Sequence, residues 1–175
     1  GSLSRLNLEQ AKEKFQHFEN TPIQKRFWRS YLDWLGRAKR WDNFLAFYEL
    51  MPEGSLTETL RCYHARALRG SGKLGLAWQK TQELWIHGES RPAQCDPVFK
   101  LWFKSSVFND SAVKGRVLAA FRAGNLGLMN YAARLGSQAL DDWTTMVKRI
   151  YSKPQRIGRY DLAVGDPFSS ELITA

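Results

Sequence analysis

The sequence predicts an all-α fold in which short antiparallel helix pairs stack into a right-handed superhelix, an α-solenoid of tetratricopeptide type. Three observations support this class. Apolar residues recur with helical spacing along most of the chain, helix-capping residues and glycines separate these segments, and similar turn sequences recur between paired helices. No segment alternates apolar and polar residues for long enough to predict a strand. An irregular globular helix bundle is the alternative class.

Eight segments carry apolar residues at steps of three or four, and each predicts a short amphipathic helix. Together with the punctuation below they indicate about eight or nine helices of roughly 9 to 16 residues. In chain order the sets are Ile23, Phe27, Tyr31, Leu35 and Ala38; Trp41, Phe44, Leu45 and Tyr48; Leu56, Leu60, Tyr63 and Ala67; Leu74, Ala77, Trp78, Thr81, Leu84 and Trp85; Val98, Leu101 and Trp102; Val113, Val117 and Phe121; Leu128, Tyr131, Ala132 and Leu135; Leu140, Trp143, Val147 and Ile150.

Capping residues mark the predicted helix ends. Thr21-Pro22 and Asp96-Pro97 are each typical of an N-cap followed by proline at the first helical position. Ser55-Leu56-Thr57-Glu58 matches a capping box, with Ser55 as the cap. Four glycines follow periodic segments, where we expect a left-handed residue to end the helix: Gly70, Gly88, Gly124 and Gly136.

Three short stretches form a weak internal repeat between paired helices: Arg40-Trp41-Asp42, Gly72-Lys73-Leu74 and Gly124-Asn125-Leu126. The first two lie about 32 residues apart, close to the period of tetratricopeptide-type helix pairs. The third follows after about 52 residues, so the array is not strictly regular. Helices joined by such short links must run antiparallel.

The two ends of the chain suggest that it is part of a longer protein. Gly1-Ser2 is typical of the scar that remains after protease cleavage of a tag, so it is excluded from the fold. Asp166-Pro167 predicts the start of another helix, Phe168–Ala175, which has no stop signal of its own. We therefore expect the natural protein to continue beyond Ala175.

Charge gives only a broad indication of partners. The net charge is +9 among 175 residues, and the pI is about 9.8. Such a balance favours anionic partners such as nucleic acid, a membrane surface or an acidic polymer. However, the basic residues are dispersed, with short clusters only at 24–26 and 37–40. A solvated helix surface is the simpler interpretation, and no apolar run is long enough to predict a membrane span.

Motifs for metal binding and catalysis are missing from the sequence. His17, His64 and His87 share no metal-ligand spacing. Cys62 and His64 are two positions apart and point to different faces of a helix. The pair Asp141-Asp142 could raise a carboxyl pKa and so make a general acid, but it lies where a helix begins and where negative charge stabilises the helix dipole. We predict no catalytic, cofactor or metal site.

The seven tryptophans mostly lie on the apolar stripes, which predicts that they pack in the core. Trp28 and Trp34 are off the stripe of their helix. They therefore face either a neighbouring hairpin or a ligand groove, where they would stack on sugars or bases.

The two cysteines have two possible roles. Cys62 lies in a helix and Cys95 in a loop two helices further on, so a hairpin stack can bring them together. A disulfide closing this loop would stabilise the fold by about 3–4 kcal/mol in the chain-entropy model. Two buried free thiols are the alternative, and composition does not decide between them.

The run CYHARALRGSGKLGLAWQKTQELWIHGESRPAQCDPVFKLWF, residues 62–103, resembles the soluble lytic murein transglycosylase family. The likeness is to its N-terminal superhelical U-domain, the helical arm before the linker and catalytic domains. RWDNFLAFYE and FRAGNLGLMNYAARL resemble the same arm. Residues 37–136 match well, and residues 143–154 match more loosely.

The resemblance implies that Cys62 pairs with Cys95 in the oxidising bacterial periplasm. It also implies that residues 3–175 are part of the U-domain and that the C-terminal lysozyme-like catalytic domain is absent. The family's catalytic Glu precedes a Ser, as Glu89 precedes Ser90 here, but it belongs to that other domain. The catalytic role is therefore not transferred to Glu89.

The family's whole enzyme cleaves the glycan between N-acetylmuramic acid and N-acetylglucosamine without water and leaves a 1,6-anhydro product, with one carboxyl as acid and then base. The resemblance implies that this chain is a noncatalytic scaffold that supports the catalytic domain and guides glycan strands. Its expected partners are peptidoglycan, the linker and catalytic domains and other cell-wall enzymes. The alternatives are a free-standing helical-repeat adaptor for a protein segment and, from charge alone, a nucleic-acid-binding module.

Overall fold

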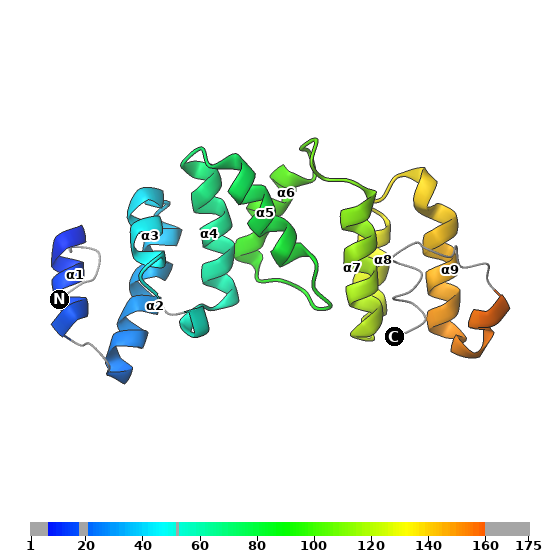
Figure 1. The fold of residues 1–175 in the computed structure, drawn as a ribbon, viewed down its shortest axis with the longest axis horizontal. Coiled ribbons are helices and arrows are strands. Elements are labelled where there is room, and N and C mark those ends of the chain that lie inside the picture. The colour runs from blue at the N-terminus through cyan, green and yellow to red at the C-terminus, as the bar shows by residue number, and fades with distance from the viewer. Residues whose placement is uncertain (1–6, 18–20, 52, 160–175) are drawn as a thin grey trace. The chain divides into compact units, whose positions relative to one another are not determined.

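The computed structural model describes residues 7–17, 21–51 and 53–159, and within these residues every regular element is helical (Figure 1). The predicted all-α class of antiparallel helix pairs is confirmed. The chain forms two compact units: residues 1–81 with 92–102, and residues 82–91 with 103–175. The predicted scar, Gly1-Ser2, and the predicted helix at 168–175 lie outside the described residues.

The first unit contains five complete α-helices, the first part of a sixth and two short 3₁₀ turns among its described residues. They are α1 (Leu8–His17), α2 (Pro22–Arg37), α3 (Trp41–Tyr48), η2 (Glu53–Ser55), α4 (Glu58–Gly70), the first part of α5 (Leu74–Trp85), η3 (Ala93–Cys95) and α6 (Asp96–Trp102).

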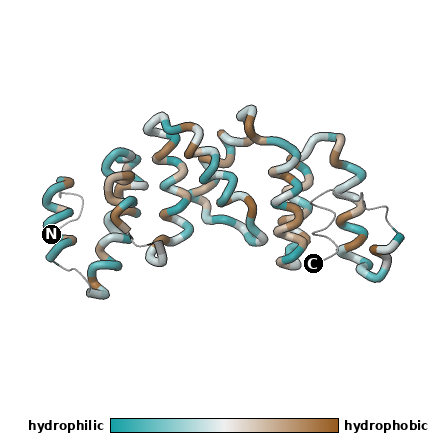
Figure 2. Tube along the Cα trace, in the orientation of Figure 1, coloured by the Kyte–Doolittle hydropathy of each residue, from teal (hydrophilic) through white to brown (hydrophobic). Residues whose placement is uncertain are grey.

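The second unit takes the end of α5 and the loop after it, and then the rest of the chain. Its further described elements are α7 (Asp110–Arg122), α8 (Leu126–Ala133), η4 (Gln138–Leu140), α9 (Asp141–Ser152) and η5 (Pro154–Arg159). Hydrophobic and hydrophilic residues alternate in short runs along these helices, as Figure 2 shows, because each helix buries only one face.

The three turns of the internal repeat have the same backbone structure. At each turn the residue in the left-handed region follows the helix end: Lys39, Gly72 and Gly124, with φ of 55°, 78° and 68°. The next N–H then donates back five residues, from Arg40 to Leu35, Lys73 to Leu68 and Asn125 to Ala120, at 3.0, 2.9 and 2.8 Å. This six-to-one bond satisfies a carbonyl at the helix end and reverses the chain. The weak repeat in the sequence therefore marks three equivalent helix hairpins.

Two of the predicted N-caps need correction. Thr21 caps α2 through its side chain, with Pro22 next, as predicted. The capping box at Ser55 is wrong, because Thr57 caps α4 by accepting from the Leu60 N–H at 3.3 Å. Ser55 is buried in η2, where its carbonyl accepts from Arg29 Nε at 3.0 Å. Asp96 is the first residue of α6 rather than its cap.

The predicted left-handed glycines are right only at Gly124. Gly70 is the last residue of α4, and a Cβ there would lie 2.2 Å from Trp41 Cδ1. A Cβ on Gly88 would lie 2.5 Å from the Ala119–Ala123 segment, at Ala123 Cβ, and one on Gly136 would lie 2.9 Å from Leu140 Cδ1. These three glycines therefore permit close packing rather than an unusual backbone angle.

The core of the first unit is rich in aromatic rings. The buried face of α2 is set by Trp28, Tyr31, Leu32 and Leu35, whereas the predicted stripe residue Ile23 is 60% exposed. The ring centroid of Trp28 lies 3.8 Å from that of Phe15 and 4.6 Å from that of Phe47. The stripe is thus rotated by one residue from the predicted one, which moves Trp28 into the core.

Gly88 gives a test of this packing. We expect Gly88→Ala to destabilise the fold by about 1–3 kcal/mol, because the new methyl group would overlap the Ala119 carbonyl oxygen, only 2.6 Å away and part of a helix backbone. Gly75→Ala in α5 is the matched control. Its Cβ meets nothing within 4 Å, so the helix gains about 0.5–1 kcal/mol. Equal midpoints for the two variants in urea unfolding would contradict the packing role of Gly88.

Candidate functional site

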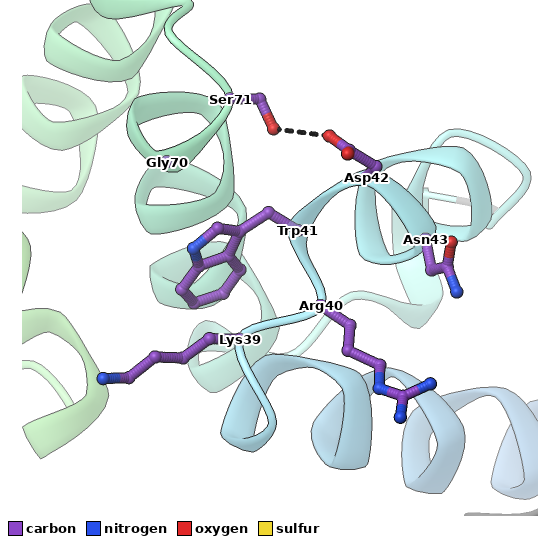
Figure 3. Close-up of a pocket in the computed structure, with 7 residues that line it drawn as sticks. All are labelled: Lys39, Arg40, Trp41, Asp42, Asn43, Gly70 and Ser71. Atoms are coloured by element: carbon purple, nitrogen blue, oxygen red, sulfur yellow. Dashed lines mark hydrogen bonds between the residues drawn. The ribbon is translucent and has the colours of Figure 1, made fainter.

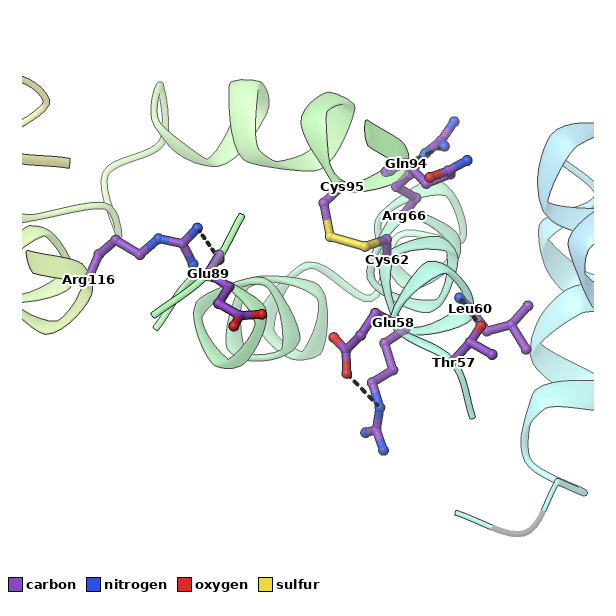
Figure 4. Close-up of a disulfide and its surroundings, with 10 residues drawn as sticks. Thr57, Glu58, Leu60, Cys62, Arg66, Glu89, Gln94, Cys95 and Arg116 are labelled. Carbon is purple, nitrogen blue, oxygen red and sulfur yellow. Dashed lines mark hydrogen bonds and ion pairs between the residues drawn. A yellow bond between two sulfur atoms is a disulfide. The ribbon is translucent and has the colours of Figure 1, made fainter. Parts of the chain in front are cut away.

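The sulfur atoms of Cys62 and Cys95 are joined in the structure, and both residues are fully buried (Figure 4). Cys62 lies in the middle of α4 and Cys95 ends η3, with 4.7 Å between their Cα atoms. Arg66, one turn after Cys62, reaches the same segment through its Nη1, which lies 3.4 Å from the Gln94 carbonyl oxygen. The bond therefore fixes the start of α6 against α4 inside the first unit.

The covalent loop between these cysteines spans 33 positions and contains residues 82–91, which belong to the second unit. The chain thus leaves the first unit, contributes one segment to the second and returns, and the disulfide joins the chain on either side of this excursion. Such a closure reduces the conformational entropy of the unfolded chain.

The central side chain of the second unit is Trp85, the last residue of α5. It is 1% exposed, and its Nε1 donates to the Ala112 carbonyl at 2.9 Å. The rings of Phe103, Phe108 and Tyr131 lie 5.0, 6.3 and 6.3 Å from it. Trp85 thus connects the end of α5 to α7 and α8.

Arg116 of α7 completes this cluster from the other side. Its Nη1 donates to the Trp85 carbonyl oxygen and its Nη2 to the Glu89 carbonyl oxygen, the latter at 3.0 Å. The guanidinium carbon lies 4.8 Å from the Trp85 ring centroid, within cation–π range. Burial, and to a lesser extent the charge of Arg91, lowers the pKa of Arg116 to about 10, so the group is charged at neutral pH. It therefore acts as a cap for the carbonyl groups at the end of α5.

The acidic residues Glu89, Asp141 and Asp142 lie in two separate segments, the loop after α5 and the start of α9. Glu89 is exposed in the loop after α5, where its N–H donates to His87 Nδ1 at 3.2 Å and its carbonyl binds Arg116. Asp141 and Asp142 are exposed in the first turn of α9, as predicted for a pair that stabilises the helix dipole. Glu89 is thus an exposed loop residue, and Asp141 and Asp142 are exposed residues at the start of a helix.

His64 and Cys62 have separate partners, in line with their predicted positions on different helix faces. The His64 ring stacks on Tyr48 at 4.0 Å, whereas Cys62 is bonded to Cys95. Among the described residues, no group of three or more His, Cys, Asp or Glu side chains is placed to hold a metal ion. No helix in the same part of the chain has the length and apolar character needed to cross a membrane.

The two off-stripe tryptophans pack within the first unit rather than in a ligand groove. Trp28 is 1% exposed. Trp34 is half-buried against the core cluster, stacks on Tyr31 at 5.8 Å and is covered by the Arg40 guanidinium at 5.0 Å. The groove alternative is therefore wrong for Trp28, and Trp34 is occupied by its own neighbours.

A shallow pocket of about 320 Å³ lies where the first two hairpin turns meet (Figure 3). Sequence reasoning missed it, because its parts come from two turns and none of them forms a motif. Trp41 forms one wall and lies against Gly70, while Ser71 Oγ donates to Asp42 Oδ1 at 3.0 Å and links the two turns. The full lining is Lys39, Arg40, Trp41, Asp42, Asn43, Gly70 and Ser71.

Reduction tests the contribution of the disulfide. We expect the double variant Cys62→Ser, Cys95→Ser to unfold with about 3–4 kcal/mol less stability, because the unfolded chain regains the entropy of the open loop. Wild-type protein unfolded in dithiothreitol should behave like the double variant, and the double variant itself should not respond to dithiothreitol. Unfolding midpoints that are equal for oxidised and reduced protein would contradict this role.

Arg116 gives a second test, because only a guanidinium spans both carbonyl oxygens. We expect Arg116→Lys to cost about 1–3 kcal/mol in urea unfolding, since one buried carbonyl loses its charged donor and Trp85 loses its planar partner. Arg134→Lys, at an exposed position, is the matched control and should be neutral. If both variants unfold at the same urea concentration, Arg116 is not a structural cap.

Comparison with known proteins identifies relatives for most of the chain. No protein-family model matches the chain. The soluble lytic murein transglycosylase of Escherichia coli strain K12 is 33% identical over 130 residues, which are 74% of this chain and 19% of that protein. The enzyme of the same name from Salmonella typhimurium is 33% identical over 111 residues, 63% of this chain and 16% of the relative. The chain therefore spans about a fifth of the length of these relatives.

Solved structures give the same fold. The 70-kDa soluble lytic transglycosylase of Escherichia coli matches with a TM-score of 0.73 at 23% identity, over 98% of this chain and 27% of that one. An inactive mutant of the lytic transglycosylase Slt from Pseudomonas aeruginosa matches with a TM-score of 0.77 at 20% identity, over the same shares. The structural matches support the all-helical fold, and the sequence matches support common ancestry with the soluble lytic murein transglycosylases. This chain is thus homologous to one helical segment of the soluble lytic murein transglycosylases.

Proposed function

We propose that this chain is a noncatalytic scaffold segment of a periplasmic peptidoglycan lytic transglycosylase. Residues 3–175 form part of its N-terminal superhelical U-domain, and a separate lysozyme-like domain carries the catalytic carboxyl. The whole enzyme cleaves between N-acetylmuramic acid and N-acetylglucosamine and leaves a 1,6-anhydro ring. The observation that supports this most directly is the 33% identity over 130 residues to the soluble lytic murein transglycosylase of Escherichia coli.

The positions of the acidic side chains support a noncatalytic role. A single carboxyl that acts as acid and then base needs an environment that shields it from water and raises its pKa. Glu89, Asp141 and Asp142 are exposed, and they lie in a loop and at a helix start. Asp110 has its pKa lowered by hydrogen bonds from Ser137, which is opposite to what a general acid requires.

A periplasmic location agrees with the paired cysteines. Disulfides persist in oxidising compartments such as the bacterial periplasm and are rare in the reducing cytosol. Cys62 and Cys95 are the chain's two cysteines, and both are committed to the one bond. The bond stabilises the scaffold where the chain passes from one unit to the other and back.

A scaffold role agrees with the way both units are packed. Gly70 and Gly88 allow a side chain or a helix backbone to approach within contact distance, and Trp85 with Arg116 fixes the end of α5 to α7. Such contacts make a rigid helical support. A positive net charge of +9 attracts the carboxylates of cell-wall peptides, which brings glycan strands to the support.

A binding and turnover assay tests the proposal. We expect the purified, oxidised chain to sediment with isolated murein sacculi, less so as the NaCl concentration rises, because the attraction is electrostatic. It should release no 1,6-anhydro-muropeptides detectable by mass spectrometry. An active lytic transglycosylase serves as the positive control for release. Anhydro products from this chain alone, or no retention on sacculi at low salt, would contradict the proposal, and retention on DNA in filter binding at physiological salt would favour a nucleic-acid-binding module.

A further inference from the structure

Lys39 has a backbone conformation that the equivalent turns reserve for glycine. Its φ is 55°, and the matching residues of the other two turns are Gly72 and Gly124. The hydrogen bonds of the three turns are the same, so the turn itself needs only a left-handed residue. A residue with a Cβ is less stable there than glycine. The first hairpin thus carries an ammonium group at a position where glycine would stabilise the fold more.

The Lys39 side chain lines the pocket where the first two turns meet, which gives a reason for this choice (Figure 3). The neighbouring cation, Arg40, makes a cation–π contact, since its guanidinium carbon lies 5.0 Å from the Trp34 ring centroid. Lys39 is exposed and lines the same pocket. It is therefore the cation that can meet a ligand in this pocket.

The other walls of the pocket are preorganised. The Trp41 indole is half-buried and lies against the bare Cα of Gly70, and the Arg66 guanidinium lies 5.5 Å from its ring centroid. The Asp42 carboxylate is oriented by Ser71, and Asn43 adds an amide that can both donate and accept. An aromatic wall with polar groups at fixed positions can receive a small amphipathic ring.

The charges select among anionic ligands. Asp42 presents a carboxylate that accepts hydrogen bonds, so a ligand that sits beside it needs hydroxyl or amide donors of its own. A phosphodiester group has none and would be repelled. A sugar has these donors, and a sugar that also carries a carboxylate can pair with Lys39.

We propose that this pocket binds an acidic N-acetylated amino sugar of a glycan strand. The Lys39 ammonium pairs with the sugar's carboxylate, Trp41 contacts the ring, and Asp42 and Asn43 bind its hydroxyl and amide groups. The assignment rests on the proposed function, since that function supplies a glycan whose muramic acid residues carry a free lactyl carboxylate wherever the stem peptide has been removed.

Binding of two disaccharides tests the pocket. The acidic probe is N-acetylglucosaminyl-N-acetylmuramic acid, and the neutral one is the N-acetylglucosamine dimer. We expect the oxidised chain to bind the acidic probe more tightly in calorimetric titration. Lys39→Gly should weaken binding of the acidic probe roughly two- to fivefold, which is the effect of losing one exposed ion pair. The affinities of the variant for the two probes should then be close to each other. Asn43→Ala should weaken the binding of both probes.

Lys39→Gly separates binding from folding. Glycine suits φ of 55°, so the variant should be as stable as the wild type or more stable in urea unfolding. Lys100→Ala, which removes one exposed cation from α6, is the matched charge control and should bind the acidic probe as the wild type does. Weaker binding in a variant of undiminished stability is what a ligand-binding lysine predicts and a structural lysine does not.

Several outcomes would overturn the pocket assignment. These are no binding of the acidic probe by the wild type, equal affinity of Lys39→Gly and wild type, or an equal loss in Lys100→Ala. Preference for a short single-stranded oligonucleotide, lost in Lys39→Gly, would also overturn it. If sacculi still retain the Lys39→Gly chain as they retain the wild type, the pocket fails and the scaffold proposal stands. If sacculi retain neither chain, the scaffold proposal itself has failed.

Discussion

The covalent loop between Cys62 and Cys95 is the constraint on which both units depend. It joins α4 to the start of α6 in the first unit, and it contains the segment 82–91 that the second unit takes from the middle of the chain. Inside that segment, Trp85 is buried and Gly88 lies against α7. Because the loop restricts how far its two ends can separate, it reduces the entropy that ordering this segment costs. Arg116 donates to the carbonyl oxygens of Trp85 and Glu89. The segment 82–91 is therefore also held by α7 within the second unit.

A second constraint acts between hairpins. The same left-handed turn recurs at Lys39, Gly72 and Gly124, and it sets each helix pair antiparallel with few linking residues. In the first unit, successive turns also meet laterally, through Trp41 on Gly70 and through Asp42 to Ser71. A repeat protein gains stability from such nearest-neighbour contacts. The residues just after the turns are therefore both helix starts and contact residues for the next hairpin.

Sequence reasoning was most accurate where the determining interactions are local. The cap at Thr21 and the three repeated turns depend on residues within about one helical turn of each other. The cap and the positions of the turns were predicted, although Gly124 was the one left-handed turn residue predicted correctly. It failed where a distant partner decides. Gly88 looks like any helix-ending glycine, and only the nearby Ala119 and Ala123 reveal a close contact. Trp28 was placed off the stripe, because the stripe was fixed from Ile23, an apolar residue that is exposed.

The candidate binding pocket could not be predicted for the same reason, and its chemistry follows from the turn geometry. Trp41 and Asp42 were visible in the sequence as turn residues and Lys39 only as part of a basic cluster, but Gly70 and Ser71, which contact Trp41 and Asp42, lie about one repeat further along. A left-handed lysine also differs from a glycine only once its φ is known. In a stack of helix hairpins, such junctions are where the backbone reverses and side chains from two hairpins meet at the surface. The turn hydrogen bonds are the same whether the left-handed residue is lysine or glycine, so this position can carry a side chain into the pocket without loss of the bonds that hold the hairpin.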